Sequence, residues 1–221
     1  VMAMYGLPDA CGEIRSICVS LRDISLRKGL ERRLEAANRQ LEEMNLKDYL
    51  TGVFNRRHFD EALQREVARL AREGGEMCIG MVDVDKFKLY NDAYGHLAGD
   101  DCLARAAKAM SAALFRPGDE LFRYGGEEFA IIMPQTGKES ATMVAERVRE
   151  AISALRIPHC QSALGHVTIS IGVAALDAAC AQSGHTACEE LIRVADKALY
   201  AAKNSGRNKV ASAACSLAES D

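Results

Sequence analysis

Hydrophobic positions recur along this chain in two alternating rhythms. Apolar side chains three or four residues apart predict helices over residues 56–73, 97–114, 138–155 and 187–204. Short, nearly continuous apolar runs predict strands over residues 77–84, 120–124, 128–133 and 166–174. The two glycines between the middle pair of strands predict a hairpin. We therefore expect an α/β fold with a mixed, mainly antiparallel sheet flanked by helices.

The first 24 residues stand apart from this pattern. Residues 12–24 predict one β-strand, and residues 9–12 before it are typical of a turn. A single strand or hairpin is not stable alone in water. We therefore expect this piece to pair with something else or to be the end of a domain that lies upstream, so that the chain is a fragment.

Residues 25–47 predict one long N-terminal helix. Its apolar positions are spaced 4-3-4-3, and its flanks are almost entirely polar: Leu30, Leu34, Ala37, Leu41 and Met44. A helix lying on its own domain is the alternative, but the narrow stripe favours a short parallel coiled coil between two copies of the chain.

The composition excludes several classes of protein. With 48% hydrophobic and 27% charged residues, a net charge of −3 and no tryptophan, the chain is typical of globular proteins and lacks the basic excess of nucleic-acid binders. No apolar run is long enough to span a bilayer, and the first ten residues do not form a signal peptide. The eight cysteines form no C-x-x-C pair, so we expect mostly buried, reduced thiols in a cytoplasmic protein.

Two acidic residues end the most apolar of the predicted strands. Asp83 and Asp85 have the spacing that places both carboxylates on one face. They are either solvated acids, a cap for the next turn, or part of a site. A calcium loop of the EF-hand type is excluded, because Lys88 stands where that loop requires glycine.

The second unusual segment is the predicted hairpin turn. Glu127 and Glu128 follow Gly125 and Gly126 directly, and glycines allow a ligand to approach the backbone closely. Carboxylates beside bare backbone suit a magnesium-bound triphosphate. The sequence contains neither a Walker loop nor a G-x-G-x-x-G motif, so a nucleotide site here is of another type.

From residue 48 to about residue 210 the chain resembles the GGDEF family of diguanylate cyclases, with the GGEEF variant of the signature at residues 125–129. Other family blocks follow in order: 48–57 (DYLTGVFNRR), 83–88 (DVDKFK), 91–100, 170–174 (SIGVA), 195–200 (ADKALY) and 203–208 (KNSGRN). The resemblance implies a fold like the palm of polymerases and nucleotidyl cyclases. It also implies condensation of two GTP into cyclic di-GMP with release of two pyrophosphates.

The resemblance also implies roles for the acidic residues. Asp83, the carbonyl of Val84 and Glu127 would bind Mg²⁺ or Mn²⁺, of which two per active site are expected. Glu128 would be either the second metal ligand or the base that activates the 3′-hydroxyl; both roles stay open, as does that of a spectator on the hairpin.

Six further residues are expected to bind GTP. Asn91 and Asp100 would read guanine, whose N1–H and N2–H₂ donors match a carboxylate. The triphosphate would meet the backbone amides of Phe87 and Lys88. It would also meet the side chains of Lys203 and Arg207, which we expect one helical turn apart on one face.

An inhibitory site for cyclic di-GMP is implied by the R-x-x-D motif at residues 116–119. Pro117 and Gly118 at its centre predict a type II turn that brings Arg116 beside Asp119. Arg147 on the following helix is a further candidate contact. The alternative is a simple ion pair across a turn.

Taken with the resemblance, these patterns predict four parts. They are the end of a PAS-like sensor domain (1–24), a signalling helix (25–47), a GGDEF domain (48–210) and a frayed tail (211–221). We expect a homodimer that contacts neither nucleic acid nor membrane within this fragment, although the whole protein could be anchored upstream. The alternative function is an inactive receptor that binds cyclic di-GMP or GTP.

Overall fold

The computed structural model describes residues 2–8, 14–21 and 46–215 of the chain. Residues 25–45 of the predicted signalling helix, with its seam, lie outside the described residues. Its last two predicted residues are described and are not helical, because Lys47 forms a β-bridge with Phe54. The first two described segments form a hairpin by themselves: strand β1 (Met2–Pro8) pairs antiparallel with β2 (Ile14–Leu21). This hairpin contains the strand that the sequence predicted.

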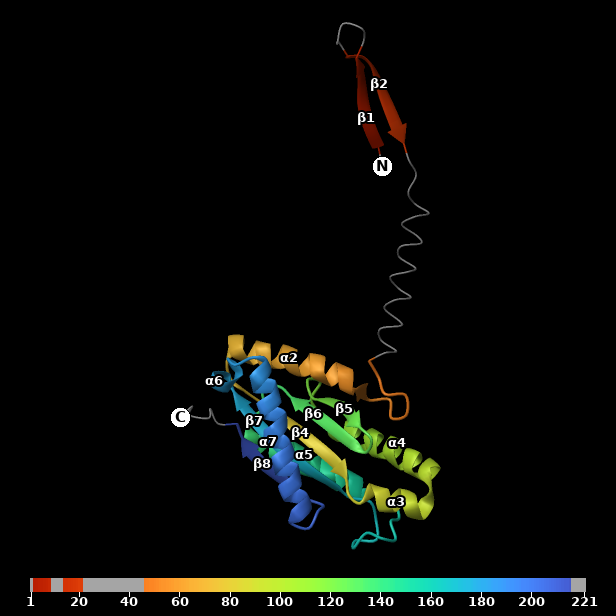
Figure 1. Ribbon diagram of the computed structural model, residues 1–221, viewed down its shortest axis with the longest axis vertical. Helices are drawn as coiled ribbons and strands as arrows, with labels where there is room; N and C mark the ends of the chain where they lie inside the picture. Colours follow the sequence, from red (N-terminus) through yellow and green to blue (C-terminus); the bar gives the residue numbers. More distant parts are fainter. Residues whose placement is uncertain (1, 9–13, 22–45, 216–221) are drawn as a thin grey trace. The chain divides into compact units, whose positions relative to one another are not determined.

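The remaining part of the chain forms one sheet covered by helices on both faces (Figure 1). The strand order is β3-β5-β6-β4-β7-β8. The outer pairs β3–β5 and β7–β8 are parallel, whereas the three central pairs are antiparallel. The mixed, mainly antiparallel sheet is therefore confirmed.

The strands of this sheet are β3 (Phe54–Asn55), β4 (Glu76–Val84), β5 (Glu120–Gly125), β6 (Glu128–Met133), β7 (Ile169–Asp177) and β8 (Val210–Ala214). The helices are α2 (Arg56–Glu73), α3 (Phe87–Tyr94), α4 (His96–Ala113), α5 (Lys138–Ala154), α6 (Ala178–Ala181) and α7 (His185–Asn204). Residues 211–214, expected to be frayed, belong to β8, which pairs with β7. No helix in the described part of the chain has the length and apolar character needed to cross a membrane.

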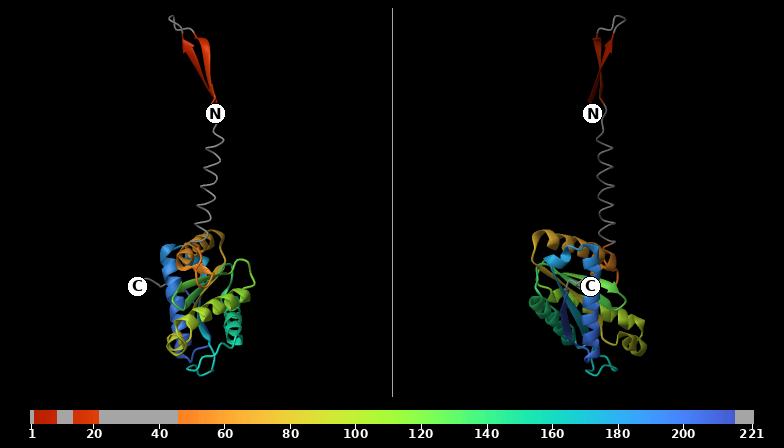
Figure 2. Two further views of the ribbon diagram at one scale, coloured as in Figure 1. Left: turned by 90° about the vertical axis from the view of Figure 1, so that its right-hand side faces the viewer. Right: turned by 60° about the vertical axis from the view of Figure 1, so that its left-hand side comes forward.

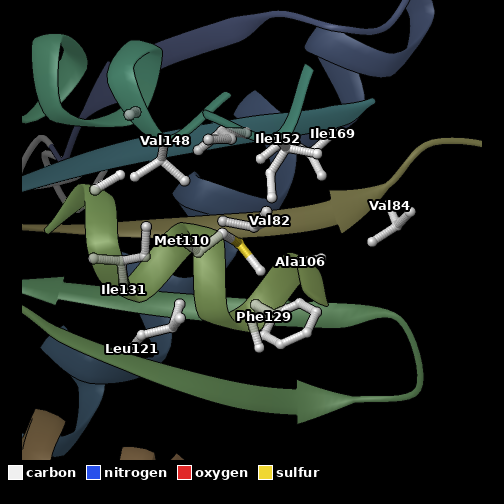
Figure 3. Close-up of a cluster of buried hydrophobic side chains, with 14 of the residues drawn as sticks. Val82, Val84, Ala106, Met110, Leu121, Phe129, Ile131, Val148, Ile152 and Ile169 are labelled. Carbon is white, nitrogen blue, oxygen red and sulfur yellow. The ribbon is translucent and has the colours of Figure 1, made fainter. Parts of the chain in front are cut away.

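Two hydrophobic clusters lie on opposite faces of the sheet. Figure 2 shows the helices that cover these faces. Helices α4 and α5 bury Met110, Val148 and Ile152 against one face, together with Phe129 and Ile131 of β6 (Figure 3). Helices α2 and α7 cover the other face. Because neighbouring side chains in a strand point to opposite faces, both faces of the central strands are apolar.

Five of the six cysteines in residues 46–215 are buried free thiols, as the sequence predicted. Burial raises the pKa of the Cys78 thiol to about 12 and that of Cys102 to about 11. These cysteines therefore act as small apolar side chains. Cys160 is exposed.

Candidate active site

Two acidic side chains face each other at the end of the central strand pair. In the antiparallel register of β4 and β6, Asp83 lies directly opposite Glu128. The next pair on the same face of these two strands is Met81 opposite Ala130, and both pack in the cluster under α7. Asp83 and Glu128 therefore continue the α7 face of the sheet, beyond the point where its apolar core ends.

The hairpin turn brings a third carboxylate to the same edge. Gly126 has a φ of 54°, a left-handed conformation that glycine adopts without strain. The carbonyl of the next residue, Glu127, lies 3.4 Å from the backbone nitrogen of Val84. Glu127 is half-buried and Glu128 is exposed. The glycine turn thus folds the signature against the end of β4.

Lysine balances part of this negative charge. The ammonium Nζ of Lys203, near the end of α7, lies 2.8 Å from Asp83 Oδ2. Burial raises the pKa of Asp83; Lys203 opposes this shift, while the charges of Glu127 and Glu128 add to it. The protonation of Asp83 therefore depends on charges from the β5–β6 hairpin and from α7.

The oxygen ligands at this edge fit magnesium. Mutual repulsion among Asp83, Glu127 and Glu128 is relieved by a cation, and carboxylates are the ligands that Mg²⁺ prefers. Among the described residues, no three histidine, cysteine or acidic side chains are arranged as a protein-only metal cluster. Magnesium commonly takes one or two carboxylates and completes its shell with substrate phosphates and water. The residues therefore fit a metal that enters with a nucleotide.

The Arg123 side chain stabilises the Gly126 turn by hydrogen bonds, a role that the sequence did not reveal. Its Nε and Nη2 donate to the Gly126 carbonyl at 3.1 and 2.9 Å, and its Nη1 donates to both oxygens of Asp48 at 2.9 and 3.1 Å. Burial by itself would raise the pKa of Asp48, but hydrogen bonds from Thr51 and the Arg123 charge hold it below its usual value. The start of the domain is thereby tied to the hairpin.

The expected guanine-binding residues lie on neighbouring helices. Asn91 is on α3, and Asp100 is exposed on α4. Asn91 Oδ1 is buried and has no hydrogen-bond partner among the described residues. A Cβ added at Gly99 would lie only 1.9 Å from this oxygen. A side chain at residue 99 would therefore displace the Asn91 amide, whose oxygen has no hydrogen-bond partner among the described residues.

The expected triphosphate contacts come from two turns. Phe87 and Lys88 form the first residues of α3, whose N-cap, Lys86, makes no side-chain cap. Helix α7 ends at Asn204, so Arg207 does not lie one helical turn from Lys203 as predicted. It lies in the following turn with a φ of 59°.

Asp85, left unassigned by the sequence, joins these two turns. It is buried and accepts hydrogen bonds from Thr168 Oγ1 at 2.7 Å, Ser170 Oγ at 2.7 Å and the backbone nitrogen of Asn208 at 3.0 Å. Its oxygens are therefore occupied within the protein. Asn208 follows Arg207, so Asp85 connects the turn before α3 with the turn that carries Arg207.

The R-x-x-D segment forms a turn, as predicted, but not of the predicted type. The Asp119 nitrogen donates to the Arg116 carbonyl at 3.0 Å, which closes a four-residue turn. Gly118 lacks the positive φ that a type II turn requires, so that part of the prediction is wrong. Burial raises the pKa of Asp119, while the charges of Arg116 and Arg147 lower it. The three predicted residues are thus close together.

Asp119 is half-buried, and its carboxylate makes no hydrogen bond. Neither carboxylate oxygen has a partner among the described residues. The Arg116 guanidinium donates instead to Thr136 Oγ1 at 2.6 Å, and Arg147 Nε donates to the Ala113 carbonyl at 2.7 Å. The Arg147 guanidinium also lies 4.1 Å from the ring centre of Phe115.

Two cavities flank this turn. One, of about 370 Å³, is lined by Asp119 together with Lys47 and Leu114. The other, of about 380 Å³, opens between α2 and the turn and is lined by Arg65, Arg69 and Arg116. No local sequence pattern indicates the two α2 arginines, because only the fold brings them near the turn.

Comparison with known proteins identifies the family. The family described as "Diguanylate cyclase, GGDEF domain" matches residues 45–209. This chain therefore belongs to the GGDEF family of diguanylate cyclases.

Individual relatives agree with this assignment. The chain is 36% identical over 216 residues to diguanylate cyclase DgcM of Escherichia coli, covering 96% of this chain and 47% of DgcM. The coiled coil and GGDEF domain of Caulobacter crescentus DgcB, solved with c-di-GMP, superposes with a TM-score of 0.74 at 32% identity, covering 86% of this chain and 97% of that one. Pseudomonas aeruginosa SiaD, solved with its activator SiaC, gives a TM-score of 0.69 at 36% identity, covering 85% of this chain and 69% of that one. The chain spans about half the length of the curated relatives DgcC and DgcM.

Proposed function

We propose that this domain condenses two GTP molecules into cyclic di-GMP and releases two pyrophosphates. The observation that carries the proposal is the convergence of Asp83, the Gly126–Glu127 turn and Lys203 at one sheet edge. Membership of the GGDEF family supports it. Because GTP is a cytoplasmic nucleotide, we place the reaction in the cytoplasm.

Asp83, the Val84 carbonyl, Glu127 and Glu128 are the proposed ligands of two magnesium or manganese ions. When bound, the metal would neutralise phosphate charge and acidify the attacking 3′-hydroxyl. Glu128 is exposed beside Asp83, so its carboxylate can also accept the hydroxyl proton. Lys203, which contacts Asp83, is near enough to donate to the phosphates once a metal neutralises that carboxylate.

Guanine would bind between α3 and α4. Its amino group would supply the donor that Asn91 Oδ1 lacks, and Asp100 would accept the neighbouring N–H groups. The Phe87 and Lys88 amides, together with Arg207, would bind the phosphates. An adenine ring does not present the same pair of donors, so this arrangement favours GTP.

Product formation would require two domains. One domain holds one GTP, and a product with two identical phosphodiester bonds needs two GTP molecules placed antiparallel. We therefore propose a homodimer with twofold symmetry at the active sites.

A second proposal concerns feedback. Cyclic di-GMP would bind at Arg116, Asp119 and Arg147, where guanine N–H groups would satisfy the unpaired Asp119 oxygens. The arginine-lined cavity beside Arg116 is suited to its phosphates.

The feedback proposal predicts that Arg116→Ala relieves product inhibition while initial rates stay within about twofold, because Arg116 lies outside the catalytic edge. Initial rates measured with increasing cyclic di-GMP test this. Arg72→Ala, an exposed arginine at the end of α2, is the matched control. Inhibition of Arg116→Ala equal to that of the parent would mean that the turn is only structural.

Incubation with GTP and Mg²⁺, followed by chromatography and mass spectrometry of the nucleotides, tests the function itself. We expect GTP to be consumed and cyclic di-GMP to accumulate. Unchanged GTP together with measurable binding of cyclic di-GMP would instead favour the receptor alternative.

A further inference from the structure

The turn between β4 and α3 contains a backbone conformation that needs support. Lys86 has φ 56° and ψ 30°, in the left-handed region, although it is not a glycine. This conformation costs an L-residue roughly 1–2 kcal/mol. Strained residues of this kind persist when their surroundings hold them in place.

A histidine from a distant loop provides such support. His159 is 1% exposed, and its Nε2 lies 3.3 Å from the Lys86 carbonyl oxygen. Its ring packs edge-on against Tyr90 of α3, with ring centres 5.4 Å apart. Because a carbonyl only accepts, Nε2 must carry the hydrogen. Burial and the Lys86 charge lower the pKa of His159, which favours the neutral ring.

Two neighbouring contacts show that the loop fits this turn. The loop spans residues 158–166. Lys86 Nζ donates to the Gln161 carbonyl at 3.3 Å, and the Cys160 nitrogen donates to the Tyr94 hydroxyl at 3.0 Å. Figure 1 shows this loop, coloured cyan, beside α3. Three consecutive loop residues therefore contact the turn or α3.

The Lys86 carbonyl belongs to the same planar peptide unit as the Phe87 N–H. In a trans peptide the two groups point in opposite directions, and they turn only together. Two donors hold this carbonyl: the Tyr90 N–H of α3 at 3.1 Å and His159 Nε2 at 3.3 Å. Together they also fix the direction of the Phe87 N–H, one of the proposed phosphate donors.

We propose that His159 is a positioning residue for GTP: through the Lys86 carbonyl, it orients the Phe87 amide toward the triphosphate. This inference rests on the proposed function, since it takes that amide as a phosphate ligand. His159 does not touch the reacting atoms. It adds to the hydrogen bond from the Tyr90 N–H and further limits rotation of the Lys86–Phe87 peptide.

Loss of the His159 donor should weaken binding more than chemistry. The Phe87 amide contacts phosphate both before and during the reaction, so its misorientation raises KM with little change in kcat. The net value of one hydrogen bond predicts a weakening of roughly three- to tenfold.

Three substitutions at His159 and one control test the proposal. His159→Phe keeps a ring against Tyr90 but removes the donor. His159→Gln places an amide donor near the position of Nε2, whereas the shorter His159→Asn cannot reach the carbonyl. His58→Phe is the control. Like His159, His58 is buried, and the Nδ1 atoms of both histidines have no partner among the described residues. His58 packs on Phe54, away from this turn.

The measurements are KM and kcat for GTP, calorimetric binding of a non-hydrolysable magnesium–GTP analogue, and the thermal unfolding midpoint. We expect His159→Phe and His159→Asn to raise KM and the analogue Kd roughly three- to tenfold with kcat within about twofold. His159→Gln and His58→Phe should bind like the parent.

Parental affinity in folded His159→Phe would overturn the proposal. If His159→Phe does not fold, equal affinities of His159→Gln and His159→Asn would overturn it, and a difference between them would support it. A parent that binds the analogue but forms no cyclic di-GMP would contradict the proposed catalysis alone, and the binding series would still decide the role of His159.

Discussion

Asp83 and Asp85 lie two residues apart but have different roles. Asp85 is enclosed by hydrogen bonds from Thr168, Ser170 and the Asn208 backbone, so it is a structural connector. Asp83 has one lysine partner and acidic neighbours, which leaves it suited to a metal. The surroundings of each carboxylate, rather than its spacing in the sequence, separate the two roles.

Substitution of Asp83 by Asn tests its proposed role in metal binding. The amide keeps the shape of the side chain but removes its charge, so we expect turnover to fall at least about 100-fold, since several kcal/mol of charge stabilisation are lost. Magnesium-dependent initial rates measure this. Glu61→Gln, an exposed acid paired with Arg57 on α2, is the control for loss of one charge. Full turnover in Asp83→Asn would rule out Asp83 as a metal ligand.

We expect Asp100 to determine the preference for guanine over adenine. Asp100→Ser removes the acceptor that matches two guanine donors, so the preference for GTP over ATP should fall roughly tenfold or more. Competition assays with both nucleotides measure the preference. Asp101→Ser changes the neighbouring acid, which pairs with Arg105, and should keep the parental selectivity. If selectivity survives in Asp100→Ser, guanine is read elsewhere.

The sequence indicated the acidic and glycine residues of the site because they stand out locally. It did not indicate His159 or Arg123, whose partners lie 73 and 75 residues away in the chain. Nothing in a local pattern distinguishes a buried histidine that supports a turn from an ordinary core histidine. Only the fold reveals these contacts.

At the scale of elements, periodicity predicted the long helices and the central strands. Helix α3 has only eight residues, too few to show a helical rhythm, and it was missed. Strand β8 consists mainly of small residues and is defined by its parallel pairing with β7, which no local pattern encodes. Short elements and long-range pairing account for the missing part of the prediction.

The packing of α7 on β7 depends on one glycine. A Cβ at Gly172 would lie 2.1 Å from the Ala195 carbonyl and 2.2 Å from the Leu199 nitrogen, both backbone atoms. Gly172→Ala should therefore lower the unfolding midpoint by about 5 °C or more. Activity should fall as well, because α7 carries Lys203.

The matched control is Gly80→Ala on the adjacent strand β4. There the nearest atom, Ile171 Cγ2, is at 3.6 Å, which is ordinary contact. Its unfolding midpoint, measured by calorimetry, should stay close to that of the parent. Equal midpoints for the two variants would contradict the close approach of α7.

At the scale of the whole molecule, activity should depend on pairing through the helix expected over residues 25–47. Leu34→Lys with Leu41→Lys places charges on the seam, so we expect a folded monomer with low specific activity that rises steeply with protein concentration. Sedimentation and initial rates over a concentration series measure this. Glu35→Lys with Glu42→Lys adds the same lysines beside the seam and should leave the dimer intact. A monomeric seam variant with full activity at low concentration would refute the tethering role.

The most direct test of the central claim is the phosphorus balance of the reaction, followed by ³¹P NMR with the parent domain, GTP and Mg²⁺. The account predicts two pyrophosphates for each cyclic di-GMP, and no product when EDTA removes the metal or when Asp83→Asn replaces the parent. Release of inorganic phosphate with GDP, or cyclic di-GMP formation that persists in Asp83→Asn, would contradict it.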